Sequence, residues 1–264
     1  MAGKRKAKEL TVSASRQLTT NMLRLTLQGK DLDSLPDDVE GAYFKLVFER
    51  PDSERPVMRT YTIARYRKEQ QEIDVDFMLH SHSENNSAGV AAAWAMQAKI
   101  GDPMSIMGPG PATFINLQAD WFMLAADMTA LPALTANLAL LPKEAKGYMV
   151  VEILSEDDRQ ELCVPANMEV VWVVNPSAGA EASPLFEAIE KLAWMEGQVA
   201  IWTACEFKTM KKIRQYYRQQ DTVQKSHLYV SSYWKQGLKE EEHKVAKRED
   251  SDTGNTTTPA AKNS

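Results

Sequence analysis

The chain has 264 residues, of which 44% are hydrophobic and 25% charged, as in an ordinary globular protein with room for two domains. Its formal net charge of −5 argues against nucleic acid as a general partner. No apolar run reaches the roughly 18 residues of a membrane span, and the basic start has no apolar stretch behind it, so we expect neither a span nor a signal peptide. The two cysteines, Cys163 and Cys205, offer no disulfide framework, which predicts a cytoplasmic location.

The first 115 or so residues have the pattern of a small β domain. Short segments with partly alternating apolar and polar residues are separated by Gly, Pro, Asp and Ser, which is typical of an antiparallel barrel. We expect strands at 10–14, 22–27, 42–48 and 72–79 and one alanine-rich helix at 88–98. Residues 1–115 are therefore predicted to form an antiparallel β-barrel domain.

The pattern changes from residue 116 onward. Apolar strand candidates alternate with amphipathic helices, which predicts an α/β domain with a parallel sheet over 116–237. The strands are expected at 121–126, 148–153, 169–174, 199–203 and 228–232. Residues 238–250 are predicted to form a charged helix, and residues 251–264 a polar tail that we expect to be disordered.

The segment from Arg59 to Arg65 combines an aromatic ring, hydroxyl groups and guanidinium groups. Arg59, Thr60, Tyr61 and Thr62 form an R-x-Y-T motif, and a further arginine follows at position 65. A flavin dinucleotide requires a flat neighbour for its ring, neutral hydrogen-bond partners for its polar edge, and guanidinium groups for its pyrophosphate. The other interpretation is an amphipathic edge strand with solvated arginines, and seven residues do not decide between them.

A second anion-binding candidate follows the strand at 72–79. Small residues at a helix start let the backbone amides approach a phosphate, although the same pattern fits a plain core helix. The candidate residues are His80, His82, Ser87, Gly89, Val90, Ala91 and Ala92. No third ligand lies near the two histidines, so no metal site is predicted. The sequence also lacks G-x-S-x-G, P-loop and G-x-G-x-x-G motifs.

Taken together, these motifs resemble the siderophore-interacting proteins, flavin-dependent ferric-siderophore reductases related to ferredoxin reductases. The ordered matches cover nearly the whole chain: R-x-Y-T, the strand ending in Leu79-His80, Gly89 with Trp94-Ala95, the segment 126–133, Cys205-Glu206, and Tyr233 to Gly237. Arg65 stands one position beyond the family's second Arg, where this chain has Ala64. The resemblance implies a two-domain fold, an FAD-binding β-barrel followed by an NAD(P)-binding-like α/β domain.

The resemblance also implies roles for particular residues. FAD would be held by the R-x-Y-T residues, Arg65, the helix-start residues and Trp234, although core packing is an equal alternative for Trp234. The ferric siderophore would meet a basic pocket, for which the candidates are Lys45, Lys235, Lys247 and Arg248. The electron-donor site would include Asp127, Thr129, Cys205 and Glu206.

The implied function is reduction of Fe(III)-siderophore to Fe(II) by a monomeric flavoprotein with no membrane or nucleic-acid partner. Ala126, Met128 and Cys205 crowd or alter the family's nucleotide site, so the donor is NADH, NADPH or a ferredoxin. Two alternatives stay open at this point. One is a related flavin reductase with another acceptor, and the other is a ferric-siderophore carrier without flavin.

Overall fold

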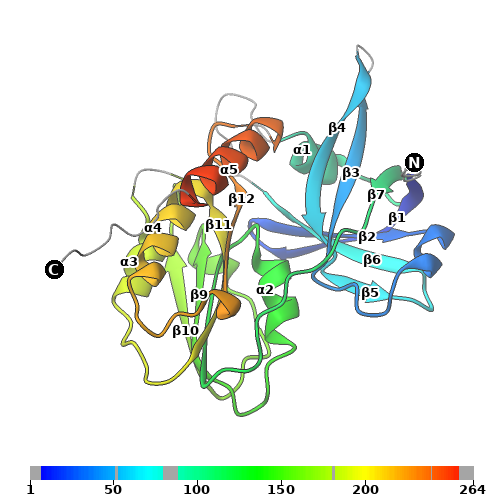
Figure 1. Ribbon diagram of the computed structural model, residues 1–264. Coiled ribbons are helices and arrows are strands. Elements are labelled where there is room, and N and C mark those ends of the chain that lie inside the picture. Colours follow the sequence, from blue (N-terminus) through cyan, green and yellow to red (C-terminus); the bar gives the residue numbers. More distant parts are fainter. Residues whose placement is uncertain (1–6, 51–52, 80–88, 180–181, 239, 256–264) are drawn as a thin grey trace, which may run out of the picture.

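The computed structural model describes residues 7–50, 53–79, 89–179, 182–238 and 240–255, which form two domains in contact (Figure 1). The first contains a seven-stranded antiparallel sheet in the order β4-β3-β7-β1-β2-β6-β5. Its strands are β1 (Lys8–Thr19), β2 (Met22–Gln28), β3 (Tyr43–Arg50), β4 (Ser53–Thr62), β5 (Arg65–Arg67), β6 (Glu72–Met78) and β7 (Pro103–Met107). The four strands predicted in this region are confirmed.

A bend between β4 and β5 closes this sheet into a barrel. On one side of the bend, Ile63 donates its backbone N–H to Ala42 O at 2.9 Å. On the other side, Ala64 donates to Asp74 O, also at 2.9 Å. One continuous segment therefore pairs first with β3 and then with β6, which leaves no open edge at this point. Apolar side chains that alternate along the strands fill the interior, because successive residues point to opposite faces.

Two short helical elements complete the barrel domain. The 3-10 helix η1 (Lys30–Ser34) buries Leu32, and α1 (Val90–Gln97) begins directly after Gly89. Ala91 and Ala95 of α1 pack into the barrel core, so the helix lies against the sheet. The predicted helix is confirmed over its described residues.

The second domain is a parallel five-stranded sheet in the order β10-β9-β8-β11-β12 with helices on both faces, as predicted (Figure 1). Neighbouring residues of β8 point to opposite faces: Leu124 packs with Leu134 of α2, and Met123 packs with Ile213 of α4. The elements are β8 (Trp121–Asp127), α2 (Leu131–Leu138), β9 (Lys146–Ile153), η2 (Glu156–Asp158), β10 (Asn167–Val174), α3 (Pro184–Glu190), β11 (Val199–Glu206), α4 (Phe207–Arg218), η3 (Lys225–His227) and β12 (Leu228–Trp234). Burial on both faces explains why residues 121–126 of β8 are all apolar.

The last helix, α5 (Glu240–Asn255), is longer than predicted. We expected the helix to end at residue 250, and it continues to Asn255. Asp250 lies in ion pairs with Arg214 (2.7 Å) and Lys211 (3.5 Å) of α4, and these contacts fix the helix where its own polar sequence would favour an early end. No helix in the described ranges is both long and apolar enough to cross a membrane.

The domains are joined at Asp158, a fully buried residue of η2. Its Oδ1 accepts hydrogen bonds from Thr19 Oγ1 (2.7 Å) and Asn21 N (2.9 Å), and its Oδ2 accepts from Asn21 Nδ2 (2.8 Å). Ser155 donates to the same Oδ2 from its backbone N at 3.1 Å. Because the partners belong to the barrel's β1–β2 turn, one carboxylate fixes the two domains to each other.

Candidate functional site

The order of strands in the parallel sheet places a crevice at the ends of β8 and β11. The chain runs from β8 to β9 and β10 on one side, then returns to β11 and β12 on the other. Ligands in open α/β sheets bind at the carboxyl ends of the strands where this reversal occurs. Here β8 ends at Asp127 and β11 ends at Cys205-Glu206, which are the residues predicted for the donor site.

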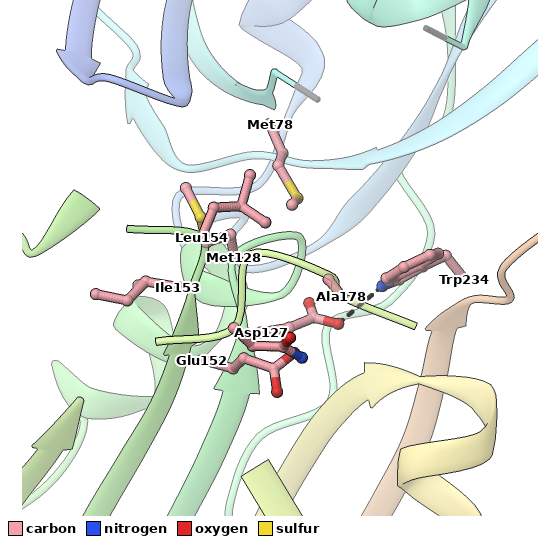
Figure 2. A pocket seen from close by; sticks show the side chains of 9 residues that line it. Met78, Asp127, Met128, Glu152, Ile153, Leu154, Ala178 and Trp234 are labelled. Carbon is pink, nitrogen blue, oxygen red and sulfur yellow. Dashed lines mark hydrogen bonds between the residues drawn. The ribbon is translucent and has the colours of Figure 1, made fainter. Parts of the chain in front are cut away.

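Asp127 is held by donors from two elements. Its Oδ1 accepts from Thr129 N (3.0 Å), Thr129 Oγ1 (2.5 Å) and Ala130 N (3.3 Å). Its Oδ2 accepts from Trp234 Nε1 at 2.8 Å, as Figure 2 shows. Burial raises the pKa of Asp127, and the hydrogen bonds from Thr129 and Trp234 oppose that rise. Trp234, predicted as a flavin residue, thus lies within the predicted donor cluster.

Glu206 is the N-cap of α4 and ties that helix to the chain after β12. Its Oε2 accepts from Lys208 N (2.5 Å) and Thr209 N (3.1 Å), and its Oε1 accepts from Gln236 N (3.3 Å). Cys205 beside it is 1% exposed, and burial raises the pKa of its thiol well above the ordinary value. Cys205 is therefore a packed neutral thiol at the crevice and not a nucleophile.

Glu152, near the end of β9, belongs to the same cluster and was missed by the sequence analysis. Figure 2 shows its side chain next to Asp127, on the wall of a small hollow that Met78 of the barrel and Trp234 also line. Burial, together with the negative charge of the neighbouring Asp127, raises the pKa of Glu152 to about 7. The signal was a lone acid within the apolar run Tyr148 to Ile153, which sequence analysis treated only as a strand.

The Glu152→Gln variant is expected to gain stability relative to the native protein as the pH rises. A folded pKa of about 7, raised from 4.5, means that the stability Glu152 contributes is complete below its unfolded pKa and is lost as pH rises through about 7. The difference should reach about 2–3 kcal/mol by pH 8. Urea unfolding at acid and alkaline pH measures it, with exposed Glu169→Gln as control. A stability difference between Glu152→Gln and native protein that does not change with pH would contradict the raised pKa of Glu152.

In the barrel domain, the R-x-Y-T residues divide between two sheet faces. Arg59 and Tyr61 pair across the strands with buried Leu46 and Phe44, whereas Thr60 pairs with Lys45. Because directly opposed residues share a face, Arg59 and Tyr61 point to one side and Thr60 to the other.

The aromatic residues beside this strand form a group of tilted, neighbouring rings near α1. The Tyr61 ring lies 4.6 Å from the Phe77 ring, with an interplanar angle of 39°, and Phe77 in turn lies 6.0 Å from Trp94 of α1. Arg59 donates from Nη1 to Met58 O at 2.9 Å and is only half-buried. A flat ring and a guanidinium group are thus side by side on one face of β4.

The start of α1 leaves space in front of its backbone. A Cβ at Gly89 would meet nothing within 4 Å, so no packing within the described residues fills this position. Val90 is 38% exposed and lines a hollow of about 610 Å³ together with Phe48 and Trp94. Ala91 and Ala92 are buried as whole residues. The predicted residues His80, His82 and Ser87 lie outside the described residues.

The remaining predicted residues differ in their surroundings. Arg65 lies beyond the bend on β5, where it is largely exposed and contacts Glu40 at 3.5 Å. Lys235 lies with Nζ 4.6 Å from the centroid of the Phe207 ring. Lys247 donates from Nζ to Ser231 Oγ at 2.6 Å, about two helical turns from the start of α5.

Arg248, next along α5, is exposed. Lys45 contacts Thr60 Oγ1 at 2.5 Å and Glu240 Oε1 at 2.7 Å. The structure therefore places Lys45 beside the R-x-Y-T strand, whereas the amine of Lys247 is directed to β12. Across the described ranges, no group of three or more His, Cys, Asp or Glu side chains is arranged to hold a metal ion.

An antiparallel barrel followed by a parallel five-stranded sheet defines a protein of the ferredoxin reductase-like fold. The cytochrome b5 reductase domain of Ulva prolifera nitrate reductase shares it at a TM-score of 0.61 and 12% identity, over 86% of this chain and 96% of that one. The family model described as "Siderophore-interacting FAD-binding domain" matches residues 11–56 and 49–113, and "Siderophore-interacting protein" matches residues 119–237. The chain belongs to the siderophore-interacting protein family.

Relatives support this assignment over most of the chain. The ferric vibriobactin reductase ViuB of Vibrio cholerae is 30% identical over 85% of this chain and 88% of its own length. The NADPH-dependent ferric-chelate reductase of Escherichia coli is 25% identical over 86% of this chain and 92% of its own. The crystal structure of the siderophore-interacting protein SipS from Aeromonas hydrophila superimposes at a TM-score of 0.81, with 30% identity, over 94% of this chain and 99% of that chain.

Proposed function

We propose that this protein is a cytoplasmic, monomeric FAD-dependent reductase that converts Fe(III)-siderophore to the Fe(II) state, from which iron is released. The observation that carries the proposal is the arrangement on β4, where Arg59 and Tyr61 share the sheet face that leads to α1 and the open position at Gly89. The names of the relatives, ferric vibriobactin reductase and NADPH-dependent ferric-chelate reductase, support the substrate class.

The residues present fit an FAD molecule. Tyr61 offers a flat ring, Thr62 a hydroxyl, and Arg59 a guanidinium group for pyrophosphate oxygens, while Gly89 leaves the first amides of α1 open. When bound, FAD supplies the ability to take two electrons from a donor and to deliver them one at a time to iron. Arg65, His80, His82, Ser87 and Trp234 stay predictions for the same cofactor.

The flavin content of the purified protein tests this proposal. The expected result is a yellow protein that releases about one FAD per chain on denaturation. The rival function, a carrier that binds ferric siderophore without flavin, predicts a colourless protein that cannot be loaded with added FAD. Such a protein would rule out the proposed reductase.

Lys45 is the leading candidate for contact with an anionic siderophore. Lys45→Ala should weaken the binding of an anionic ferric catecholate by about 5- to 10-fold at low salt, and less at 0.5 M salt, where charge attraction is screened. Titration of the FAD-loaded protein at the two salt concentrations measures this. The exposed Lys99→Ala variant serves as control, and equal affinities of Lys45→Ala and native protein at both salt levels would remove Lys45 from the site. Lys235, Lys247 and Arg248 are weaker candidates.

We expect the protein to be selective for its electron donor. Buried Ala126, Met128 and Cys205 occupy the crevice where a nicotinamide nucleotide would approach the backbone. We therefore expect slow flavin reduction by at least one of NADH and NADPH, with a reduced ferredoxin as the alternative donor. Stopped-flow reduction by the three donors in parallel measures this, and rapid saturable reduction by both nucleotides would contradict it.

A further inference from the structure

The carboxylate of Glu240, at the start of α5, occupies a site built from anion-binding groups. Its Oε2 accepts from the backbone N of Thr60 at 2.8 Å. Its Oε1 accepts from Thr60 Oγ1 at 2.6 Å and lies 2.7 Å from Lys45 Nζ and 2.9 Å from Lys244 Nζ. Two ammonium groups, a hydroxyl and a backbone amide thus converge on one carboxylate, which is the donor set that binds phosphates and other anions.

The groups that meet here come from distant parts of the chain. Lys45 and Thr60 lie opposite each other on β3 and β4 of the barrel, and Glu240 follows Lys45 by 195 positions. The rest of α5 is fixed on the second domain, through His243 Nε2 and Ser232 Oγ (2.9 Å) and through the ion pairs of Asp250. Glu240 in the first turn of α5 reaches the barrel, and in Figure 1 the helix runs from there towards the second domain.

Two ammonium groups contact the one carboxylate of Glu240 in this site. The contact is also open to solvent at its rim: the side chains of Lys45 and Lys244 are 24% and 48% exposed, and that of Glu240 is 13% exposed. A solute that brings more negative charge than one carboxylate can therefore compete for the same donors.

Protonation does not release Glu240. Burial alone would raise the pKa of Glu240, but Lys45, Thr60 and Lys244 outweigh it and hold the pKa at about 2. Glu240 is therefore ionised at any pH at which the protein is expected to work. Removal from the site requires displacement by another anion or the loss of a partner, and this excludes a pH switch.

We propose that Glu240 is a specificity-determining residue that acts as an internal competitor for anionic ferric chelates. A chelate with a net negative charge binds to Lys45, Lys244 and the Thr60 N–H and hydroxyl by displacing the Glu240 carboxylate. Weakly charged chelates do not gain enough at this site to replace Glu240. The inference rests on the proposed function, because that function supplies the ferric chelate.

The Glu240→Gln variant tests the inference in the FAD-loaded protein. It should bind the ferric tris-catecholate anion on the order of tenfold more tightly than the native protein, a typical size for coupling between competing groups. The gain should exceed any gain for an uncharged ferric tris-hydroxamate. The Glu242→Gln variant is the matched control, since it changes the charge by the same amount from an exposed position two residues further along α5.

A double variant separates competition from a general change of charge. The Lys45→Gln variant lacks one of the two ammonium groups that contact Glu240. Adding Glu240→Gln to this variant should therefore increase the affinity for the ferric catecholate by less than Glu240→Gln does in the native protein. Equal affinity of native and Glu240→Gln proteins for the anion, or an equal gain in Glu242→Gln, would overturn the inference. If the inference alone is wrong, native protein still reduces both chelates; if the proposed function is wrong, neither chelate is reduced by any variant.

Discussion

The Asp158→Ala variant is expected to lose roughly 3–4 kcal/mol of unfolding free energy, the largest stability change that we predict for a single residue. The side chain is fully buried and accepts hydrogen bonds from Thr19, Asn21 and Ser155. Alanine would leave these donors without a partner at the junction of the two domains, and each unsatisfied buried donor costs about 1–3 kcal/mol.

The neighbouring residue supplies the control. Asp157→Ala changes the same charge at an exposed position of η2 and should stay within about 0.5 kcal/mol of the native protein. Urea unfolding at neutral pH measures both variants. If the two variants have equal unfolding free energies, Asp158 does not join the domains.

The contribution of Asp158 should also depend on pH. Burial alone would raise the pKa of Asp158, but hydrogen bonds from Asn21 and Thr19 outweigh it and lower the pKa below its usual value. A lowered folded pKa means that the stability is present above the unfolded pKa, near 3.9, and is lost as pH falls through the folded pKa. The gap between native protein and Asp158→Ala should therefore narrow below about pH 4.

The Arg59→Ala variant is expected to bind FAD roughly 10- to 100-fold more weakly, which corresponds to about 1.5–3 kcal/mol for hydrogen bonds to a charged group. Arg59 shares its face of β4 with Tyr61, so its loss removes the guanidinium group predicted to hold the pyrophosphate. Arg59→Lys should lie between alanine and arginine, because it keeps the charge and loses the two-pronged geometry.

Quenching of FAD fluorescence on titration with apoprotein measures these affinities. Arg16→Ala, at an exposed position of β1 in the same barrel, is the control and should bind FAD as the native protein does. An unchanged dissociation constant in Arg59→Ala would place the pyrophosphate elsewhere and would weaken the assignment of the R-x-Y-T segment.

The sequence contained enough information for the strands and for most of the donor cluster. Alternation in the barrel and continuous apolar runs in the sheet predict where strands lie. Asp127 and Glu206 were predicted from the family resemblance, and the structure places both at the carboxyl ends of neighbouring parallel strands. The bend at Ile63-Ala64 that closes the barrel could not be found, because it depends on pairing with Ala42 and Asp74.

The residues that the sequence analysis missed depend on distant contacts. Glu240 begins a run of three glutamates, and nothing in that run shows which of them meets Lys45, 195 positions earlier. The five residues of α5 after Asp250 have low helix propensity, so the sequence predicts that the helix ends at Asp250. In the folded chain, the ion pairs of Asp250 with α4 stabilise the helix, which continues to Asn255.

The most direct test of the account is electron transfer from the reduced protein to a ferric chelate without oxygen. FAD-loaded protein is reduced photochemically and mixed with ferric tris-catecholate in the presence of a colorimetric Fe(II) chelator, while the flavin absorbance near 450 nm is followed. We predict that the oxidised flavin spectrum returns and that two Fe(II) appear per flavin, since reduced FAD carries two electrons. A flavin that stays reduced, with no Fe(II) formed beyond a protein-free control, would contradict the proposed function.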